Sequence, residues 1–443
     1  MRTHIAAFIV AAVLAGSPAR ADDGAGLAAL LSLVPDRAET THSVPVFGYV
    51  DLKAVAVAAG VGFPGSEADF AAMAERDRKA WIEAMVRVSA GPPDVVAYPA
   101  GIGRRAVTSG EALGIDWFDI DSAMTFWQPP STVTAIAGGS GFPDASAVGR
   151  ALAARGFEQR QAGGFAVWHR LEDYKLALGQ KDDAAAGDFL LGVIPRASRV
   201  ALGDGVVVHA TNWPAIEAVA ETEAGTAPLS PVATLTRGLL AATASGTGAV
   251  LLQANAFMLR DVGVAGDPGG ILSQLLDAPS AEAIQKAIAP AEPGPLLPLY
   301  PLAFIADMQD GTDQLAVIAL PYPDPVSAGA AAAVVAERLA SWVPGSGGEP
   351  LVEQLDATVE HRVVERDDIA GATFATFIAS IEAGDRERQA VAALSDTVGG
   401  AAAIVTLRVP MRADSATPVP AGAAFRAILS AIYSRAFTPL AAP

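Results

Sequence analysis

Residues 131–170 hold the pattern that most restricts how this chain can fold, because consecutive elements follow one another there with clear boundaries. The apolar, β-branched run 132–137 stops at a Gly-Gly-Ser-Gly loop, which predicts a buried strand. Asp144 can accept hydrogen bonds from the first turn of a helix, and Gly156 stands where a left-handed residue ends one. A helix is therefore predicted over 145–155.

A tight hairpin is predicted directly after this helix. Segments 157–162 and 165–170 flank Gly163-Gly164, a pair that tolerates the positive φ angles of a two-residue turn. The whole stretch therefore predicts a β-α-β-β unit.

The glycines before the helix allow a second interpretation. A strand followed by Gly139-Ser140-Gly141 and a helix is also how a dinucleotide-binding fold begins. Asp144 stands in the place of the third glycine, however, Pro143 stiffens the turn, and the next strand enters an antiparallel hairpin instead of a second crossover helix. A plain loop is the preferred interpretation, and no cofactor is expected.

Residues 1–21 have the pattern of a secretory signal peptide. Arg2 supplies the positive end, 5–15 the apolar segment, and Ala19-Arg20-Ala21 a small-x-small cleavage site. A membrane anchor is the alternative, but the apolar run is too short for a bilayer, which needs about 20 residues. We expect cleavage after Ala21, a mature chain that starts at Asp22, and a periplasmic or secreted protein.

The mature chain would be acidic and free of cysteine. The formal net charge of the full sequence is −18, and it becomes −20 when Arg2 and Arg20 leave with the signal. Such a surface repels phosphate backbones, so nucleic acid is not expected as a partner. The absence of cysteine excludes disulfides, thiolate nucleophiles and Cys-ligated zinc. With 51% hydrophobic residues, the chain must instead be held together by large apolar cores.

The 422 residues that remain after cleavage are enough for two or three domains. Glycine and proline dominate 263–270 and 290–298. A connection is therefore predicted over 263–298, between an N-terminal α+β domain over 22–262 and a C-terminal α+β domain over 299–443.

The expected fold class is α+β, with mostly antiparallel sheets and helices on one face. A second hairpin over 200–210, around an Asp-Gly turn, joins the first unit in an arrangement of ferredoxin-like character. The last third repeats the order, with a strand over 315–320, Asp324 before a helix, and a hairpin over 358–365 and 372–379. Internal duplication is the preferred hypothesis, although any two β-α-β-β units share much of this periodicity.

A single long helix is predicted to start at Ser66, with an apolar stripe that belongs to the core. The stripe consists of Phe70, Met73, Trp81, Met85 and Val88.

Three carboxylates lie close together within 114–127, where Asp116, Asp119 and Asp121 offer the oxygen ligands that calcium prefers. The segment lacks the glycine and the final glutamate of a calcium loop. The preferred interpretation is that Asp116 and Asp121 cap short turns or helices, and no metal is expected.

Residues 238–259 carry no charge, and their number would suffice to span a bilayer. Polar residues and glycines dilute their apolarity, so a core helix that breaks at Gly246 before a buried strand is preferred, and no span is expected in the mature chain. A final helix with Phe425, Ile428 and Leu429 on one face is expected to pack in the core, because its basic face is too weak for a membrane surface.

The chain lacks the H-E-x-x-H, G-x-S-x-G, S-x-x-K and P-loop patterns, so any active site would be assembled from dispersed residues. His209 lies in a strand that is apolar on both faces and is expected to be a satisfied core histidine. Glu158, Arg160 and His169 form the constellation with the most catalytic potential, because the predicted turn places His169 opposite Glu158 and on the same face as Arg160. A carboxylate beside an imidazole can fix its tautomer for base catalysis, but a structural cross-strand pair is the preferred interpretation.

Two classes of function follow. The preferred one is an exported, non-catalytic binding or scaffolding protein, whose acidic lobes engage a protein or a small ligand in the cell envelope. The alternative is a periplasmic hydrolase with a dispersed site that includes Glu158, Arg160 and His169. A cleft with converging His, Ser and carboxylate side chains would favour the hydrolase, and a shallow apolar patch would favour the partner.

Overall fold

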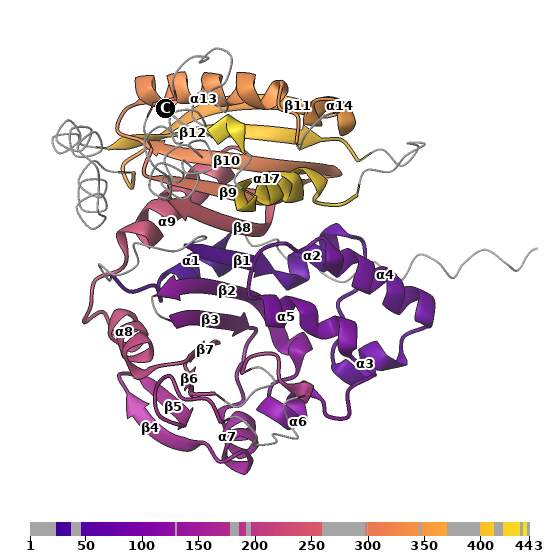
Figure 1. The fold of residues 1–443 in the computed structure, drawn as a ribbon, viewed down its shortest axis with the longest axis vertical. Helices are drawn as coiled ribbons and strands as arrows, with labels where there is room; N and C mark the ends of the chain where they lie inside the picture. The colour runs from indigo at the N-terminus through magenta and orange to yellow at the C-terminus, as the bar shows by residue number, and fades with distance from the viewer. Residues whose placement is uncertain are drawn as a thin grey trace, which may run out of the picture.

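The computed structural model describes the greater part of the chain (Figure 1). The described residues are 24–36, 46–128, 131–177, 186–191, 196–258, 297–298, 300–344, 348–369, 399–411, 420–434 and 437–440. The predicted signal peptide, the strand expected over 372–379 and nearly all of the connection expected over 263–298 lie outside these residues.

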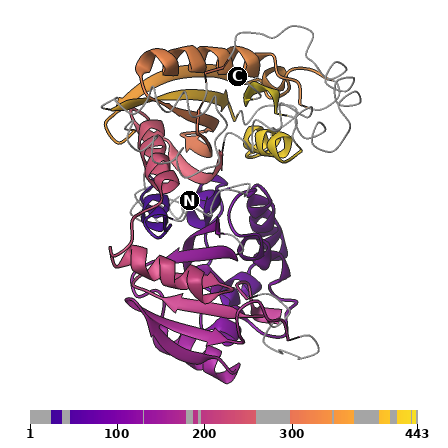
Figure 2. The same cartoon turned by 60° about the vertical axis from the view of Figure 1, so that its left-hand side comes forward.

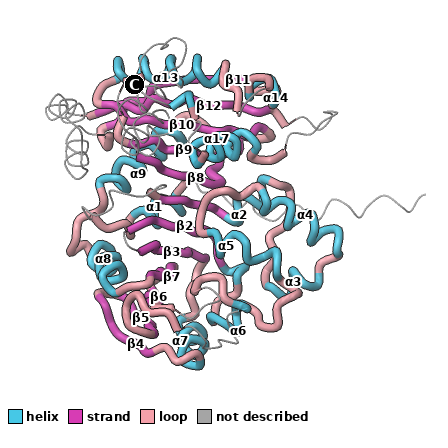
Figure 3. The backbone as a smooth tube through the Cα atoms, in the orientation of Figure 1, coloured by secondary structure: helices cyan, strands magenta, loops and turns pink. Residues whose placement is uncertain are grey.

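The described strands form one twelve-stranded sheet in which every neighbouring pair is antiparallel. From edge to edge the order is β11-β12-β10-β9-β8-β1-β2-β3-β7-β6-β5-β4, and Figure 3 shows them stacked along the long axis of the molecule. The strands are β1 (Phe47–Asp51), β2 (Ile120–Gln128), β3 (Ser131–Gly138), β4 (Glu158–Ala162), β5 (Phe165–Arg170), β6 (Ser198–Leu202), β7 (Val206–Ala210), β8 (Val250–Met258), β9 (Leu302–Asp310), β10 (Asp313–Tyr322), β11 (Thr358–Arg366) and β12 (Gly400–Val409). The expectation of a mixed chain with a large antiparallel sheet is confirmed.

The central β-α-β-β unit has the predicted boundaries to within a residue or two. After β3, Asp144 accepts hydrogen bonds from the N–H groups of Ser146 and Ala147 and begins α7 (Ala145–Ala154). Gly156 follows with a φ of 76°, in the left-handed region where a side chain would be strained. β4 and β5 then pair as a hairpin around Gly163-Gly164.

The middle of the sheet joins segments from both sides of the predicted connection. β8 pairs with β1 on one side and with β9 on the other. The backbone hydrogen bonds therefore continue from the part of the chain before 263–298 to the part after it, and the division into two domains stays a prediction.

Helices cover both faces of this sheet, so the expectation of helices on one face is wrong (Figure 1, Figure 2). On β10, Leu315 and Val317 belong to the core beneath α9, whereas Ala316 and Ile318 belong to the core beneath α13. Because successive side chains of a strand point to opposite faces, strands that are buried at every position need a cover on each side. The sequence expectation recognised buried strands, such as that of His209, but did not draw from them the need for helices on both faces.

The first face carries one apolar core beneath α1 (Ala25–Leu31), α8 (Trp213–Glu223) and α9 (Pro231–Ala244). The second face carries two cores. One lies beneath α13 (Pro325–Ala340), α14 (Leu351–Gln354) and α17 (Ala423–Tyr433), near η5 (Thr438–Leu440). The other lies beneath α2 (Leu52–Ala58), α3 (Glu67–Ala72), α4 (Glu75–Val86), α5 (Pro93–Ala97), α6 (Ser109–Leu113) and α7, with η2 (Tyr98–Gly101) and η3 (Trp117–Asp119) between them.

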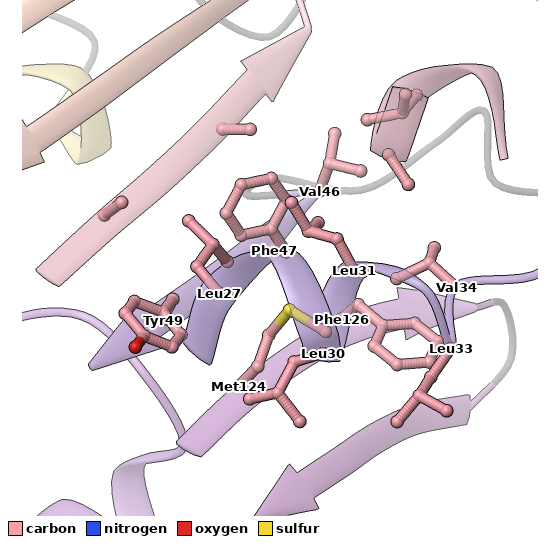
Figure 4. Close-up of a cluster of buried hydrophobic side chains, with 14 of the residues drawn as sticks. Leu27, Leu30, Leu31, Leu33, Val34, Val46, Phe47, Tyr49, Met124 and Phe126 are labelled. Atoms are coloured by element: carbon pink, nitrogen blue, oxygen red, sulfur yellow. The ribbon is translucent and has the colours of Figure 1, made fainter. Parts of the chain in front are cut away.

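Figure 4 shows part of the core on the first face, where α1 packs on the sheet. Leu27, Leu30 and Leu31 are buried against Phe47 of β1 and Phe126 of β2. Burial of a leucine side chain stabilises a fold by roughly 1.5–3 kcal/mol, so this short helix is held by its packing rather than by its helix propensity.

Two local predictions in the N-terminal part are wrong. The helix expected from Ser66 is divided into α3 and α4, because Met73 and Ala74 adopt extended backbone with ψ near 145°. Phe70 and Trp81 nevertheless share one core, as the stripe predicted. Asp121 does not cap a turn, because it lies within β2 and pairs with Lys53.

The later elements follow the predicted pattern more closely. α9 ends before Gly246, whose φ is 71°, and β8 follows as a buried strand. β11 has the predicted place, but its partner among the described residues is β12, about 40 residues further along the chain. α17 buries its apolar stripe, as expected. Among the described residues, no helix is both long and apolar enough to cross a bilayer.

Candidate functional site

The β4–β5 hairpin brings Glu158 and His169 together in the predicted register. The two residues are direct partners across the strands, and Arg160 is the partner of Val167. The register follows from the two-residue turn and is confirmed. In the described part of the chain, no hydrogen bond joins the Glu158 carboxylate to the His169 imidazole.

The hairpin packs on the start of α8, where Trp213 organises what we call the Trp213 cluster: Glu158, Arg160, His169, Arg199 and Trp213. The guanidinium carbon of Arg160 lies 4.2 Å from the centroid of the Trp213 ring system, and that of Arg199 lies 5.0 Å from it. The His169 ring meets the same indole edge-on at 5.0 Å. These are cation–π and aromatic contacts, which stabilise packing.

Arg199 anchors this cluster from inside the sheet. Its side chain is 1% exposed, and it donates hydrogen bonds to the carbonyl oxygens of Arg170, at 3.1 Å, and Ser198, at 2.9 Å. Its guanidinium also pairs with Asp173, whose carboxylate accepts from the backbone N–H of Trp213. These partners offset the cost of burying the Arg199 charge, because an unpaired charge in an apolar sheet would destabilise the fold.

The surroundings of His169 favour a neutral imidazole. Partial burial lowers the pKa of His169, and Arg199 and Arg160 lower it further, while Glu158 opposes them. Among the described residues, no serine or threonine hydroxyl is hydrogen-bonded to this ring. A neutral imidazole can accept a proton, but here it has no nucleophile to activate.

Sequence reasoning missed Arg199, Asp173 and Trp213. Arg199 gave a signal, because it is a charged residue within an otherwise apolar strand and such a charge requires a partner. Trp213 follows Asn212, which caps α8 by accepting from the N–H of Ala215. Nothing local indicates that this helix start would lie under the hairpin.

His209 is buried on β7, as expected, but one of its ring nitrogens lacks the hydrogen bond that was also expected, as far as the described residues show. Its Nε2 atom has no hydrogen-bond partner among the residues that the structure describes. Burial lowers the pKa of His209 to about 3, and the nearby Arg196, Arg199 and Arg170 act in the same direction.

A cavity of about 480 Å³, which we call the glycine-loop pocket, lies at the loop between β3 and α7. Its volume is typical of small-molecule sites, which occupy roughly 300–1,000 Å³. It is lined by Lys53, Phe63, Pro64, Gly65, Phe118, Asp119, Gly139, Ser140, Gly141, Phe142 and Asp144.

The apolar walls of this pocket are fixed by packing behind them. Phe118 is 3% exposed and lies 5.5 Å from Phe63, centroid to centroid, and 5.5 Å from Trp81. The backbone of Phe142 donates to Gly139, and its carbonyl accepts from Gly205. A Cβ atom on Gly138 would lie 2.4 Å from the Phe142 ring, so only glycine allows the loop to close here.

The three carboxylates considered for calcium do not converge. Asp116 caps η3 and also accepts from the backbone N–H of Glu67, Asp121 pairs with Lys53, and Asp119 lines the pocket. In the part of the chain that the structure describes, no group of three or more His, Cys, Asp or Glu side chains is arranged to hold a metal ion. Partial burial and Asp116 raise the pKa of Asp119, while Lys53 lowers it.

No family model matches the chain, and no curated protein matches it. A solved structure titled "Structure of crystal form III of TP0453" is 7% identical over 73% of this chain and 88% of that one, with a TM-score of 0.26. A similarity at this level is not a basis for transferring a fold or a function.

Proposed function

We propose that this chain is an exported, non-catalytic binding protein of the cell envelope. One observation carries the proposal: two of the three catalytic candidates, Arg160 and His169, contact Trp213, where the His169 ring meets the indole and is close to the charges of Arg160 and Arg199. The feature best suited to recognition is the glycine-loop pocket, whose aromatic walls are preformed. Preformed concave sites of this size are typical of small-ligand binding.

Export is part of the same proposal. Cleavage after Ala21 would leave α1 intact, since that helix begins at Ala25 and buries Leu27, Leu30 and Leu31. The mature chain would then enter its core within a few residues of its start. N-terminal sequencing of the exported protein is expected to begin at Asp22, and a membrane-bound product that retains 5–15 would contradict this.

We further propose that the two halves derive from a duplicated, ferredoxin-like β-α-β-β unit. In support, β2-β3-α7-β4 and β9-β10-α13-β11 share the order of hairpin, helix and strand. Asp144 and Asp324 also cap the two helices alike, each accepting from two backbone N–H groups. An alignment of natural relatives of both halves would test this idea.

The binding function is tested by recovering the ligand. The exported protein is purified from its native envelope fraction, and the small molecules it retains are extracted and identified by mass spectrometry. Ser140→Trp, at an exposed lining residue, is expected to lose the retained compound because the indole would fill part of the cavity. Ser430→Trp, on the exposed side of α17, serves as the matched control.

The hydrolase alternative is tested with His169→Gln. We expect this substitution to lower stability by no more than about 1 kcal/mol, the size of a cross-strand pair, and to change no hydrolytic activity. His361→Gln, at an exposed histidine of β11, is the control. Loss of a measured ester, peptide or glycoside hydrolysis in His169→Gln alone, with the fold intact, would refute the binding proposal and support the hydrolase.

A further inference from the structure

The chemistry of the glycine-loop pocket identifies a class of ligand, an inference that depends on the proposed binding function. The walls are aromatic: Phe63, Phe118 and Phe142 contribute ring surface from three separate segments. Phe118 and Phe142 are buried, so their positions do not depend on a ligand. Such walls accept a flat or aliphatic body and, on their ring faces, a cation.

Negative charges outnumber positive ones among the residues that line the pocket. Among the described residues, Lys53 is the cationic residue that lines the pocket, and its ammonium group is already paired with Asp121. Asp119 is exposed, its carboxylate accepts a hydrogen bond from the backbone of Asp116, and among the described residues no salt bridge engages it. Asp144 is a second lining carboxylate. The pocket therefore has a negative potential.

The backbone of the loop does not compensate for this charge. The N-terminus of a helix usually attracts anions through its free N–H groups. At α7 these groups already donate to Asp144, at 2.9 Å from Ser146 and 3.0 Å from Ala147. A phosphate or carboxylate ligand would meet donors that are already occupied and the negative charges of two lining carboxylates, Asp119 and Asp144.

One contact within the protein shows that the aromatic wall tolerates a cation. The Lys53 ammonium nitrogen lies 5.9 Å from the centroid of the Phe63 ring, within the range of a cation–π interaction. A second ammonium group near Asp119 would have the same kind of aromatic surface beside it and, in the described part of the chain, a carboxylate that no salt bridge engages.

We propose that the glycine-loop pocket binds a small organic cation, with its apolar body against Phe63, Phe118 and Phe142 and its ammonium group at Asp119. The preference for a cation arises from the two carboxylates, and the affinity for the body arises from the aromatic walls.

The test uses three probes of similar size that differ in charge: 2-phenylethylamine, 2-phenylethanol and 3-phenylpropionate. Their binding to the purified mature protein is measured by isothermal titration calorimetry at neutral pH and low salt. We expect the amine to bind about fivefold more tightly than the alcohol, which is the size of one partly exposed ion pair, and the propionate to bind most weakly. Added salt should reduce the difference.

Two variants separate the contribution of the Asp119 charge to binding from that of the aromatic wall. Asp119→Asn is expected to remove the preference for the amine and to leave the affinity of the alcohol unchanged. Phe63→Leu is expected to weaken the amine and the alcohol together. Glu353→Gln, at an exposed residue of α14, should behave like the parent, and the thermal unfolding of each variant confirms that it is folded.

Three outcomes would overturn the proposal: equal binding of the amine and the alcohol or propionate, binding of none of the probes, or an unchanged amine preference in Asp119→Asn. If the amine and the alcohol bind equally and Ser140→Trp abolishes both, the pocket is a binding site and only the assignment of a cation fails. If a native ligand is recovered that is anionic, the binding function again stands without this inference.

Discussion

His209 shows at the residue scale how a buried side chain makes stability depend on pH. It lies on β7 between Thr134 of β3 and Val200 of β6, and its imidazole is fully buried, with no hydrogen-bond partner for Nε2 in the described part of the chain. Three arginines, Arg196, Arg199 and Arg170, disfavour its protonation. The folded protein therefore holds this side chain in its neutral form.

The sign of the resulting pH dependence follows from the two pKa values. The pKa of His209 is about 3 in the folded protein and 6.5 in its ordinary environment. Between these values the unfolded chain binds more protons, so the free energy of unfolding falls as the pH falls through this window and is restored above it. The contribution lost between pH 7 and pH 5 is about 2 kcal/mol.

His209→Leu removes this titration without adding a charge. We expect the variant to lose about 2 kcal/mol less stability than the parent between pH 7 and pH 5, measured by urea unfolding at both values. His361→Leu, at an exposed position of β11, should lose as much as the parent. An identical loss in His209→Leu and the parent would mean that His209 is not held neutral.

At the element scale, a side chain of the edge strand β11 caps the C-terminal end of helix α9. Arg362 donates to the carbonyl oxygens of Thr243, at 2.8 Å, and Ala242, at 3.3 Å, and also bonds to that of Ser245. Ala242 and Thr243 belong to the last turn of α9 and Ser245 is its C-cap residue, so these carbonyl groups lack partners within the helix. The guanidinium also lies at the negative end of the helix dipole.

Arg362→Ala is therefore expected to lower the free energy of unfolding by about 1–2 kcal/mol, because it leaves several carbonyl oxygens without a donor. Arg362→Lys should recover part of the loss, since an ammonium group keeps the charge but not the planar fork. Arg237→Ala, at an exposed position within α9, is the control and should change stability by less than about 0.5 kcal/mol. If Arg362→Ala behaves like Arg237→Ala in urea unfolding, the contact is not a cap.

At the scale of the whole molecule, the two faces of the sheet are organised differently. The first face has one apolar core that includes strands from β12 to β4. On the second face, two cores are separated by buried polar side chains near the middle of the sheet. These include Gln253 and Asn255 of β8 and Asp307 of β9.

This polar boundary is held together by Arg87, Gln253 and Asp307. The Asp307 carboxylate accepts from Gln253, at 2.8 Å, and lies 3.4 Å from the Arg87 guanidinium, and both charged side chains are 2% exposed. Gln253 in turn accepts from the backbone N–H groups of Ser89 and Ala90. Burial raises the pKa of Asp307, and Arg87 opposes this shift.

We expect Arg87→Met and Asp307→Leu each to cost about 3–5 kcal/mol, because each leaves the other charge buried without its partner. The double variant should cost clearly less than the two losses combined, since no unpaired charge remains. Urea unfolding of the four proteins measures the coupling. Strictly additive losses would mean that the two side chains act independently.

The same experiment tests the division into two domains. Five of the six tryptophans lie in the N-terminal half, and the sixth is Trp342, so tryptophan fluorescence reports mainly on the N-terminal half and far-UV circular dichroism on the whole chain. With β1, β8 and β9 in one ladder and one core along the first face, we expect coincident transitions. Two separate transitions would support independent domains.

The sequence by itself determined the local structure of this protein. Asp144, Gly156 and the Gly163-Gly164 turn act on backbone groups only a few residues away, so the helix, its end and the register of Glu158 with His169 could be predicted.

Only the tertiary structure decided which strands pair and which distant side chains lie beside one another. The pairing of β8 with β1, and of β11 with β12, joins strands that are far apart in the chain, and no short pattern encodes such a choice. The same holds for Trp213 beneath the hairpin and for the three phenylalanines around the glycine-loop pocket. Their positions depend on the packing of many apolar residues at once, because burial has no direction and favours any arrangement that removes enough apolar surface from water.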